Sequence, residues 1–149
     1  MNGKAEKWQA FVKENKINAF TMEEVNNDLH PVLFRSNFDT DGVRLPLMLV
    51  LDDSIYTMFQ VLVARKAVTP ENKAALEELL NSYNKQFKVF KYYTNDEGDI
   101  CLDTCIPSTV DSFDPVIIRS VIDVVLKHLQ EKYAEIMKLV WNKLEIKGN

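Results

Sequence analysis

Acidic side chains gather in three short polar segments, and the first of them resembles a metal-binding loop. Asp39 and Asp41 stand at alternate positions before Gly42, as the first ligands of a calcium-binding loop do. Such a loop closes with a glutamate at its twelfth position, and here that position is Val50. We therefore interpret residues 39–42 as a tight turn between strands and predict no calcium site in them.

The other two acidic segments could also do chemistry, but both are typical of turns. Residues 96–99 place three carboxyl groups around Gly98, and a weak ion site is the alternative to a hairpin turn there. Asp52 and Asp53 could act as an acid–base pair. We expect them at the tip of a hairpin, where water leaves carboxyl groups with ordinary acidity. We predict no catalytic residue in either segment.

The two cysteines and two histidines do not form a recognisable metal site. Cys101 and Cys105 are four positions apart on a predicted strand, which separates their Cα atoms by ~13 Å. A disulfide requires less than ~7 Å, so we expect two reduced thiols. His30 is expected in a loop and His128 at the edge of an apolar helix stripe. We predict no metal ligand and no cofactor, because no phosphate-binding loop or nucleophile motif is present either.

The composition indicates one globular domain over residues 1–149. Hydrophobic residues make up 46% and charged residues 27% of the 149 residues, the balance of an ordinary soluble domain. No apolar run reaches the ~20 residues of a membrane span, and the charged N-terminal segment lacks the apolar core of a secretion signal. We therefore expect a cytoplasmic protein without membrane association. A net charge of -4 argues against nucleic-acid binding.

An apolar hairpin over residues 43–65 is the centre of the predicted fold. Both arms alternate, so each has two distinct faces. A three-residue loop over 52–54 places the leucine face of the first arm beside the more apolar face of the second, whereas a two-residue loop exchanges the faces of the second arm. We predict the three-residue loop. The rows that it brings together are Leu45, Leu47, Leu49 and Leu51, and Ile55, Thr57, Phe59, Val61 and Val63.

Helices are expected before, after and within the strand-forming part of the chain. Residues 3–16 carry a narrow apolar stripe at helical spacing around Trp8. Thr69 followed by Pro70 is typical of a helix start, so a crossover helix is predicted over residues 69–84. Thr21 with a glutamate three positions later fits a capping box and predicts a short helical turn.

The last predicted helix begins with Asp114 as its cap and continues to residue 144. Its apolar stripe corresponds to a helix of ~42 Å, which is longer than a domain of this size. We expect the helix either to bend near Tyr133 or to project from the domain. Trp141 is expected to plug the core, and the alternative is an anchor for a partner protein.

Further strands are predicted at residues 32–39, 87–93 and 99–106, where apolar and polar residues alternate or aromatic residues are frequent. Strands interrupted by single helices, without regular alternation, indicate the α+β class. The predicted order is α-β-β-β-α-β-β-α, with an antiparallel sheet packed by helices.

One part of the sequence resembles a known family. The predicted crossover helix ends in Leu79-Leu80-Asn81-Ser82-Tyr83-Asn84, and Phe87, Lys91-Tyr92-Tyr93 and the turn Asp96-Glu97-Gly98-Asp99 follow it. This pattern, together with Leu33-Phe34, Tyr133 and Trp141, is similar to that of the YbjN-type family of small bacterial proteins, described as sensory transduction regulators. The resemblance implies the fold of class I type III secretion chaperones, a protein-binding role and a homodimer. It implies no catalytic residue.

The second face of the hairpin is the predicted protein-binding site. It is apolar and includes two methionines, which suit adaptable packing; its residues are Met48, Val50, Tyr56, Met58 and Leu62. The alternative is that the crossover helix covers this face. We expect a non-enzymatic regulator or chaperone-like protein that binds another protein, and an exposed apolar patch would support it. Other possibilities are a small-ligand-binding domain or enzyme with acidic turns lining a pocket, and a passive structural domain.

Overall fold

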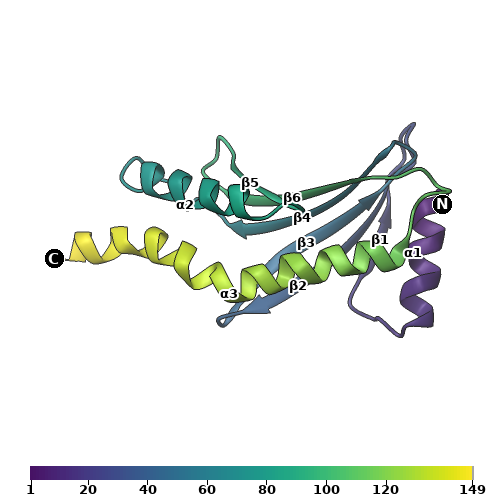
Figure 1. The fold of residues 1–149 in the computed structure, drawn as a ribbon, viewed down its shortest axis with the longest axis horizontal. Coiled ribbons are helices and arrows are strands. Elements are labelled where there is room, and N and C mark those ends of the chain that lie inside the picture. Colours follow the sequence, from purple (N-terminus) through teal and green to yellow (C-terminus); the bar gives the residue numbers. More distant parts are fainter. Residues whose placement is uncertain (149) are drawn as a thin grey trace.

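Three helices and a six-stranded antiparallel sheet make up the fold of the described residues, which confirms the predicted α+β class (Figure 1). The structure is a computed structural model that describes the backbone of residues 1–148 and the side chains of residues 1–141. In chain order the elements are α1 (Gly3–Glu14), β1 (Thr21–Glu24), β2 (Val32–Thr40), β3 (Val43–Leu51), β4 (Tyr56–Ala64), α2 (Lys73–Gln86), β5 (Lys91–Thr94), β6 (Ile100–Pro107) and α3 (Pro115–Gly148).

The strands lie in the order β1-β2-β3-β4-β6-β5, and every neighbouring pair is antiparallel. Short connections join β1 to β4 in sequence. Helix α2 then carries the chain to the outer strand β5, and β6 returns between β5 and β4. The pairing of β4 with β6 therefore joins segments that are separated by a helix and a strand in the chain.

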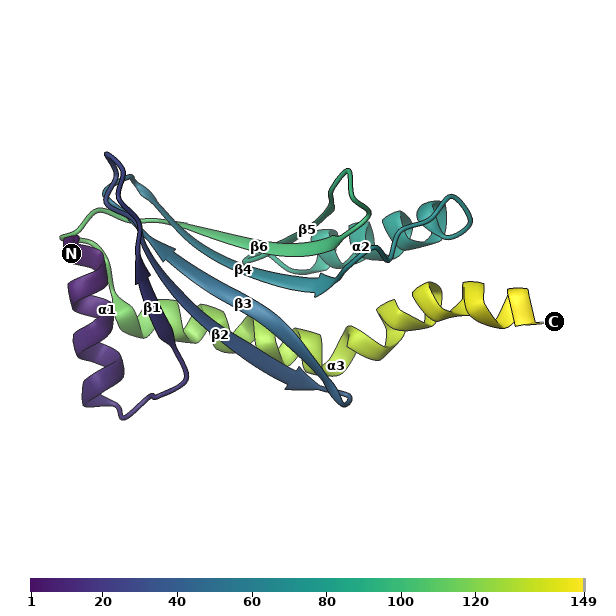
Figure 2. The same ribbon diagram turned by 180° about the vertical axis from the view of Figure 1, so that it is seen from behind.

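All three helices contribute to a core on one side of the sheet. Trp8 of α1, Leu76 of α2 and Leu129 of α3 are buried in the same apolar cluster. Figure 2 shows the opposite side of the sheet, with α3 behind the strands and no helix of the described chain in front of them. The fold therefore has one helix layer and one sheet layer, and none of the described helices covers the second side of the sheet.

The leucine row of β3 faces the core, as the alternation of the hairpin predicts. Leu49 pairs with Phe59 and Leu47 with Val61 across β3 and β4, and all four side chains are buried. This packing confirms which face of each arm lies inside.

The predicted three-residue loop is wrong, because Leu51 pairs with Thr57 rather than Ile55. The side-chain oxygen Oδ1 of Asp52 accepts a hydrogen bond from the Ser54 backbone N–H at 2.9 Å, which holds a wider connection over residues 52–55 between β3 and β4. Ile55 is consequently 54% exposed. The predicted assignment of side chains to the two faces is still correct, because a register shift of two residues leaves every side chain of β4 on the same face.

Residues 21–24 form strand β1 and not the predicted helical turn. Met22 pairs with Phe34 of β2, and all four residues of β1 are exposed. The free edge of β2 supplies backbone partners for the whole segment, and these outweigh a local capping preference.

The helix boundaries agree with the prediction at α3 and differ at α2. Pro115 begins α3, and Oδ1 of Asp114 accepts a hydrogen bond from the Val116 N–H at 2.9 Å. Helix α2 begins only at Lys73, because Thr69 donates its N–H to Oδ1 of Asn72 at 2.7 Å in a preceding turn. Strand β5 likewise starts at residue 91 rather than 87.

Helix α3 bends along its length and extends past the sheet on the side of α2 (Figure 1). Trp141 lies on this extension and is 48% exposed. The predicted core plug is therefore wrong, because the end of α3 runs beyond the apolar cluster that a tryptophan there would have filled.

Candidate functional site

The uncovered side of the sheet, which we call the open face, has an apolar centre. Its side chains come from alternate positions of each strand, so none of them reaches the core. Two rows cross the strands from β2 to β6, and no member of either row is buried: Leu33, Val50, Met58 and Cys105, and next to them Arg35, Met48, Gln60 and Asp103.

The five predicted protein-binding residues all lie on the open face. Val50 and Met58 are a cross-strand pair, Leu62 pairs with Cys101, and Met48 pairs with Gln60. These side chains are half-buried or exposed.

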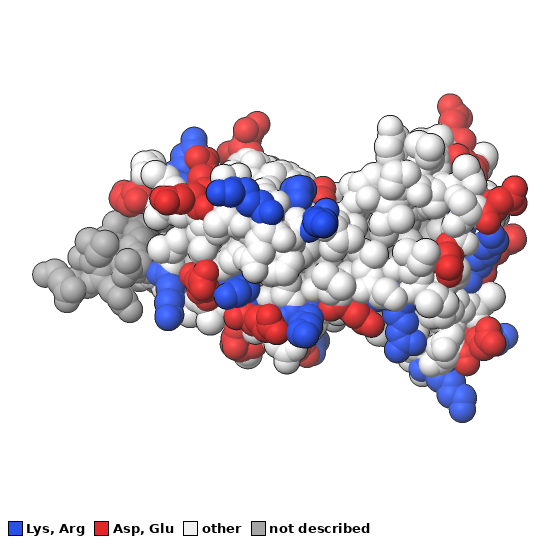
Figure 3. Space-filling view, in the orientation of Figure 1, with Lys and Arg blue, Asp and Glu red and all other residues white. Residues whose placement is uncertain are grey.

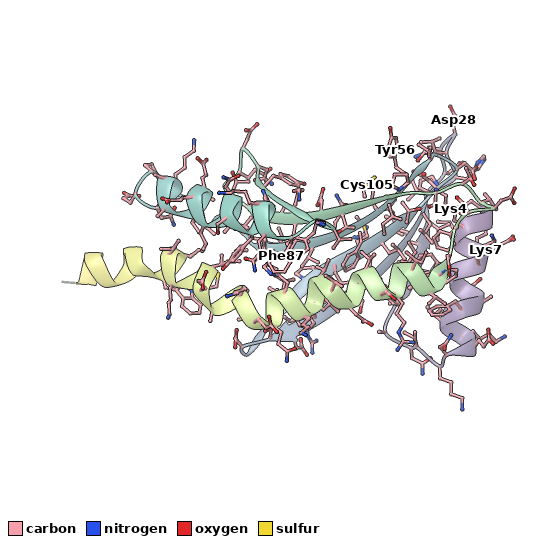
Figure 4. The ribbon with its side chains drawn as sticks, viewed as in Figure 1. Lys4, Lys7, Asp28, Tyr56, Phe87 and Cys105 are labelled. Carbon is pink, nitrogen blue, oxygen red and sulfur yellow. The ribbon has the colours of Figure 1, made fainter. Side chains whose placement is uncertain are left out.

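Tyr56 is the most exposed of the five predicted residues, at 57%. It pairs with Pro107 at the end of β4. Figure 4 shows it with Cys105 at the end of the sheet where α1 lies.

Helix α2 does not cover the open face. Its apolar residues Leu76, Leu80 and Tyr83 are buried in the core on the other side of the sheet. The alternative in which the crossover helix shields Met48 and Met58 is therefore wrong. The apolar centre of this face has no cover within the described chain.

A hollow of about 300 Å³ indents the open face between β2, β3, β4, β5 and β6. Met48 and Leu62 provide apolar walls, while Gln60, Tyr93 and Asp103 provide polar groups. Arg35 and Arg65 lie at its margin. A concave, partly apolar site with a few convergent polar groups is the usual form of a recognition site.

Asp103 has a buried carboxylate oxygen in the wall of the hollow. Its Oδ2 accepts a hydrogen bond from Nε2 of Gln60 at 3.2 Å. Its Oδ1 has no hydrogen-bond partner among the described residues. Burial raises the pKa of Asp103 above its ordinary value, against the hydrogen bonds from Gln60 and Tyr93. Nearby, burial raises the pKa of Tyr93 to about 12, and the negative charge of Asp103 adds to the effect.

Sequence reasoning did not identify Asp103, Gln60 or Tyr93 as candidates. The available signal was that Asp103 shares a strand face with Cys101 and Cys105, which makes it a carboxylate in a mostly apolar row. Its meeting with Gln60 depends on the pairing of β6 with β4, which no local pattern specifies. Both cysteines are free thiols on the open face, and burial raises the pKa of the Cys101 thiol.

The acidic segments hold turns. Asp41 and Gly42 have φ angles of 51° and 76°, and the carboxylate of Asp39 accepts a hydrogen bond from Nε of Arg44 at 2.9 Å, which lowers the pKa of Asp39. In the turn before β6, Oδ1 of Asn95 accepts the Asp99 N–H at 2.9 Å. Within the described residues, no three His, Cys, Asp or Glu side chains are grouped so that they could hold a metal ion.

His128 lies in the core and not at the stripe edge, and it is 3% exposed. Its Nε2 is 2.8 Å from the hydroxyl of Tyr92, and the ring of Phe90 lies 4.5 Å away, centroid to centroid. The hydroxyl of Tyr83 donates to Glu135 nearby at 2.5 Å. The cluster is a polar network inside an aromatic core, and it does not line the hollow.

Lys4 anchors α1 beneath the end of the open face that carries Tyr56. It belongs to the polar side of the predicted helix, yet it is fully buried, and burial lowers its pKa. Its Nζ donates to the backbone oxygen of Ser54 at 2.7 Å. This contact supports the β3–β4 turn from the core side, which leaves Tyr56 free to project (Figure 4).

A second exposed apolar surface lies on the first half of α3. Val116, Ile117 and Val124 are exposed there. Figure 3 shows uncharged surface over this part of the molecule, with most charged side chains towards its outline. The surface is one helix wide, whereas the open face spans several strands and contains the hollow, so the open face is the better candidate.

No family model matches the chain, and no curated protein is similar to it in sequence. No helix in the part of the chain that the structure describes is both long and apolar enough to cross a membrane.

Proposed function

We propose that the protein is a non-enzymatic, protein-binding regulator or chaperone-like protein that acts as a homodimer, with the open face as the dimer surface. The observation that carries the proposal is the uncovered apolar centre of this face. An antiparallel sheet can leave one side to water, but that side is then mostly polar. Here Val50, Met58 and Leu62 occupy it and are half-buried within the single chain, and apolar surface left without cover is typical of an interaction site.

The charges around the open face favour a second copy of the chain as the occupant. Nη2 of Arg35 is 3.4 Å from Glu23, and Nε of Arg44 is 2.9 Å from Asp39. Because these rim charges are already paired within one chain, two identical faces can meet without bringing unpaired like charges together. Methionines at the centre can adjust their side chains to the packing of two twisted sheets.

The two ends of β4 carry opposite charges that an antiparallel partner would bring together. Arg65 follows β4 at one end and forms no ion pair with the described residues. The acidic turn with Asp52 and Asp53 precedes β4 at the other end. In a dimer whose strands run in opposite directions across the interface, each Arg65 faces the acidic turn of the other copy.

The resemblance to the YbjN-type family supports the regulatory or chaperone-like role and the homodimer. A non-enzymatic role is supported by the placement of the residues with shifted pKa values. His128 and Tyr92 are enclosed in the core, and Asp103 has no histidine, lysine or second carboxylate beside it in the hollow.

A ligand-binding or enzymatic domain is the second candidate. An open depression of about 660 Å³ beside α2 is lined by Asp96 and Glu97, which is the arrangement that this candidate requires. Lys73 at its margin lies 3.9 Å from Glu77, and no hydrogen-bonded acid–base couple is found among the residues that line it. We therefore prefer the dimer.

The test is the mass in solution of the wild-type chain and of Met58→Glu, measured by analytical ultracentrifugation over a range of concentrations. We expect the wild type to be a dimer and Met58→Glu a monomer, because a carboxylate at the centre of the interface would be buried without a partner. Val124→Glu places the same charge on the apolar surface of α3 and should remain dimeric. A wild type that stays monomeric at every concentration contradicts the proposal.

A further inference from the structure

The open face carries both a protruding aromatic side chain and a hollow. Tyr56 stands at the start of β4 and is 57% exposed, whereas the hollow lies further along the same strand, beside Gln60 and Leu62. All three residues occupy alternate positions of β4, so their side chains leave the sheet on the same side. One face therefore contains both a projection and a recess.

The spacing of the two features suits a two-fold dimer. Tyr56 and Leu62 are six positions apart, which is ~20 Å along an extended strand. A two-fold axis that lies in the plane of the interface, perpendicular to β4 and level with Met58 and Gln60, places Tyr56 of each copy above the hollow of the other. Because such an interface is isologous, the two contacts are identical and form together.

The chemistry of the hollow fits a phenol. Met48 and Leu62 offer an apolar sulfur and methyl groups to an aromatic ring. The carboxylate of Asp103 accepts a hydrogen bond from Gln60 at Oδ2 and interacts with the hydroxyl of Tyr93, while its buried Oδ1 has no well-formed hydrogen bond within the described chain. A carboxylate can accept several hydrogen bonds, and a buried tyrosine hydroxyl usually finds one acceptor.

We propose that Tyr56 of each copy inserts into the hollow of the other copy and donates its hydroxyl hydrogen to the carboxylate of Asp103. This inference rests on the proposed homodimer and specifies which contact orients it. The guanidinium groups of Arg35 and Arg65 at the margin of the hollow lie where they can approach the edge or face of the inserted ring.

The first experiment measures the dimer dissociation constant of two Tyr56 variants by analytical ultracentrifugation. Tyr56→Ala should weaken the dimer by about 1,000-fold, because two buried aromatic anchors are lost. Tyr56→Phe keeps the ring and should weaken it by about 100-fold, through loss of two hydrogen bonds to a carboxylate. Ile55→Ala is the matched control, because Ile55 is equally exposed on the same turn but has no partner in this arrangement.

Mixing two variants tests directly whether Tyr56 of one copy inserts into the hollow of the other. Leu62→Trp fills the hollow but keeps Tyr56, whereas Tyr56→Ala keeps the hollow but lacks the inserting side chain. Each variant alone has no intact contact, but a mixed dimer has one. We therefore expect native mass spectrometry of the mixture to show the mixed dimer in excess of the statistical fraction.

The outcomes separate this inference from the proposed function. A monomeric wild type overturns both. A dimer that is lost in Met58→Glu but unchanged in Tyr56→Ala overturns only the Tyr56 contact. Loss of the dimer in Val124→Glu and not in Met58→Glu places the interface on α3 and overturns both. If the mixture of Leu62→Trp and Tyr56→Ala shows no excess of the mixed dimer, Tyr56 does not insert into the hollow, even if Tyr56→Ala weakens the dimer.

Discussion

The hydroxyl of Tyr92 and Nε2 of His128 lie 2.8 Å apart inside an otherwise aromatic part of the core. Tyr92 comes from β5 and His128 from α3, so this contact joins the outer strand of the sheet to the long helix. Burial and, to a lesser extent, the positive charge of Lys132 lower the pKa of His128 to about 4, while the charge of Glu135 opposes the change. The imidazole is therefore neutral in the folded protein at neutral pH.

The stability of the protein should fall as the pH decreases from about 6.5 to about 4. The pKa of an unfolded histidine is near 6.5, so in this window the unfolded chain binds a proton at His128 that the folded chain does not. The neutral imidazole contributes its full stabilisation above about pH 6.5, and this contribution is lost progressively as the pH falls towards about 4. The loss is on the order of 3 kcal/mol at the lower end.

Urea unfolding at several pH values checks this prediction, with His128→Phe as the comparison. The variant is expected to be less stable at neutral pH, because the hydroxyl of Tyr92 loses its partner, but its unfolding free energy should change less between pH 6.5 and pH 4. Because the carboxyl groups titrate in both proteins, the quantity to compare is the slope of the unfolding free energy against pH in the wild type and in the variant. Identical slopes would show that His128 does not titrate differently on unfolding.

Two turn glycines should differ in their tolerance of alanine. Gly42 and Gly98 both have positive φ angles, of 76° and 82°, a conformation that costs alanine roughly 1–2 kcal/mol. A Cβ atom at Gly42 would meet nothing within 4 Å, whereas at Gly98 it would lie 3.0 Å from the backbone oxygen of Val68. Gly98→Ala should therefore destabilise the protein more than Gly42→Ala.

Thermal unfolding of the two glycine variants measures this difference. The oxygen of Gly98 also accepts the backbone N–H groups of Ala67 and Val68 at 2.9 and 3.0 Å, so movement of this turn would weaken both bonds. Equal melting temperatures for the two variants would contradict the close approach of the turn before β6 to the segment after β4.

The thiols on the open face should report on the proposed dimer. Cys105 is exposed in the single chain, and it pairs with Met58 at the centre of the face. In a face-to-face dimer both Cys105 and Cys101 are covered. Labelling with a thiol reagent should therefore slow down as the wild-type concentration rises, and it should be independent of concentration in Met58→Glu. Labelling of Cys105 that never slows would contradict cover of this face.

The sequence-based prediction of the fold succeeded where short-range patterns decide the structure. Alternation in β3 and β4 places Leu49 and Phe59 inside and Met58 outside, because successive side chains of a strand leave opposite faces. Asp114 and Pro115 specify the start of α3 by a local hydrogen bond and a restricted φ angle. These are properties of neighbouring residues, so they can be predicted without the tertiary structure.

The prediction failed where a distant segment supplies the partner. The turn between β3 and β4 is widened by Asp52 and supported by Lys4, which is far away in the sequence. Residues 21–24 become a strand because β2 offers a free edge. Trp141 lies outside the core because the end of α3 extends beyond the apolar cluster to which the rest of the helix contributes.

The sequence by itself determined the two faces of the central hairpin, the α+β class and the apolar character of Met48, Val50, Tyr56, Met58 and Leu62. Only the tertiary structure decided that all three helices pack on one side, so that this face is uncovered. It also decided that Asp103 meets Gln60, because β6 inserts between β5 and β4. The physical reason is that local periodicity specifies which side chains share a face, whereas long-range strand pairing and helix docking decide what lies opposite them.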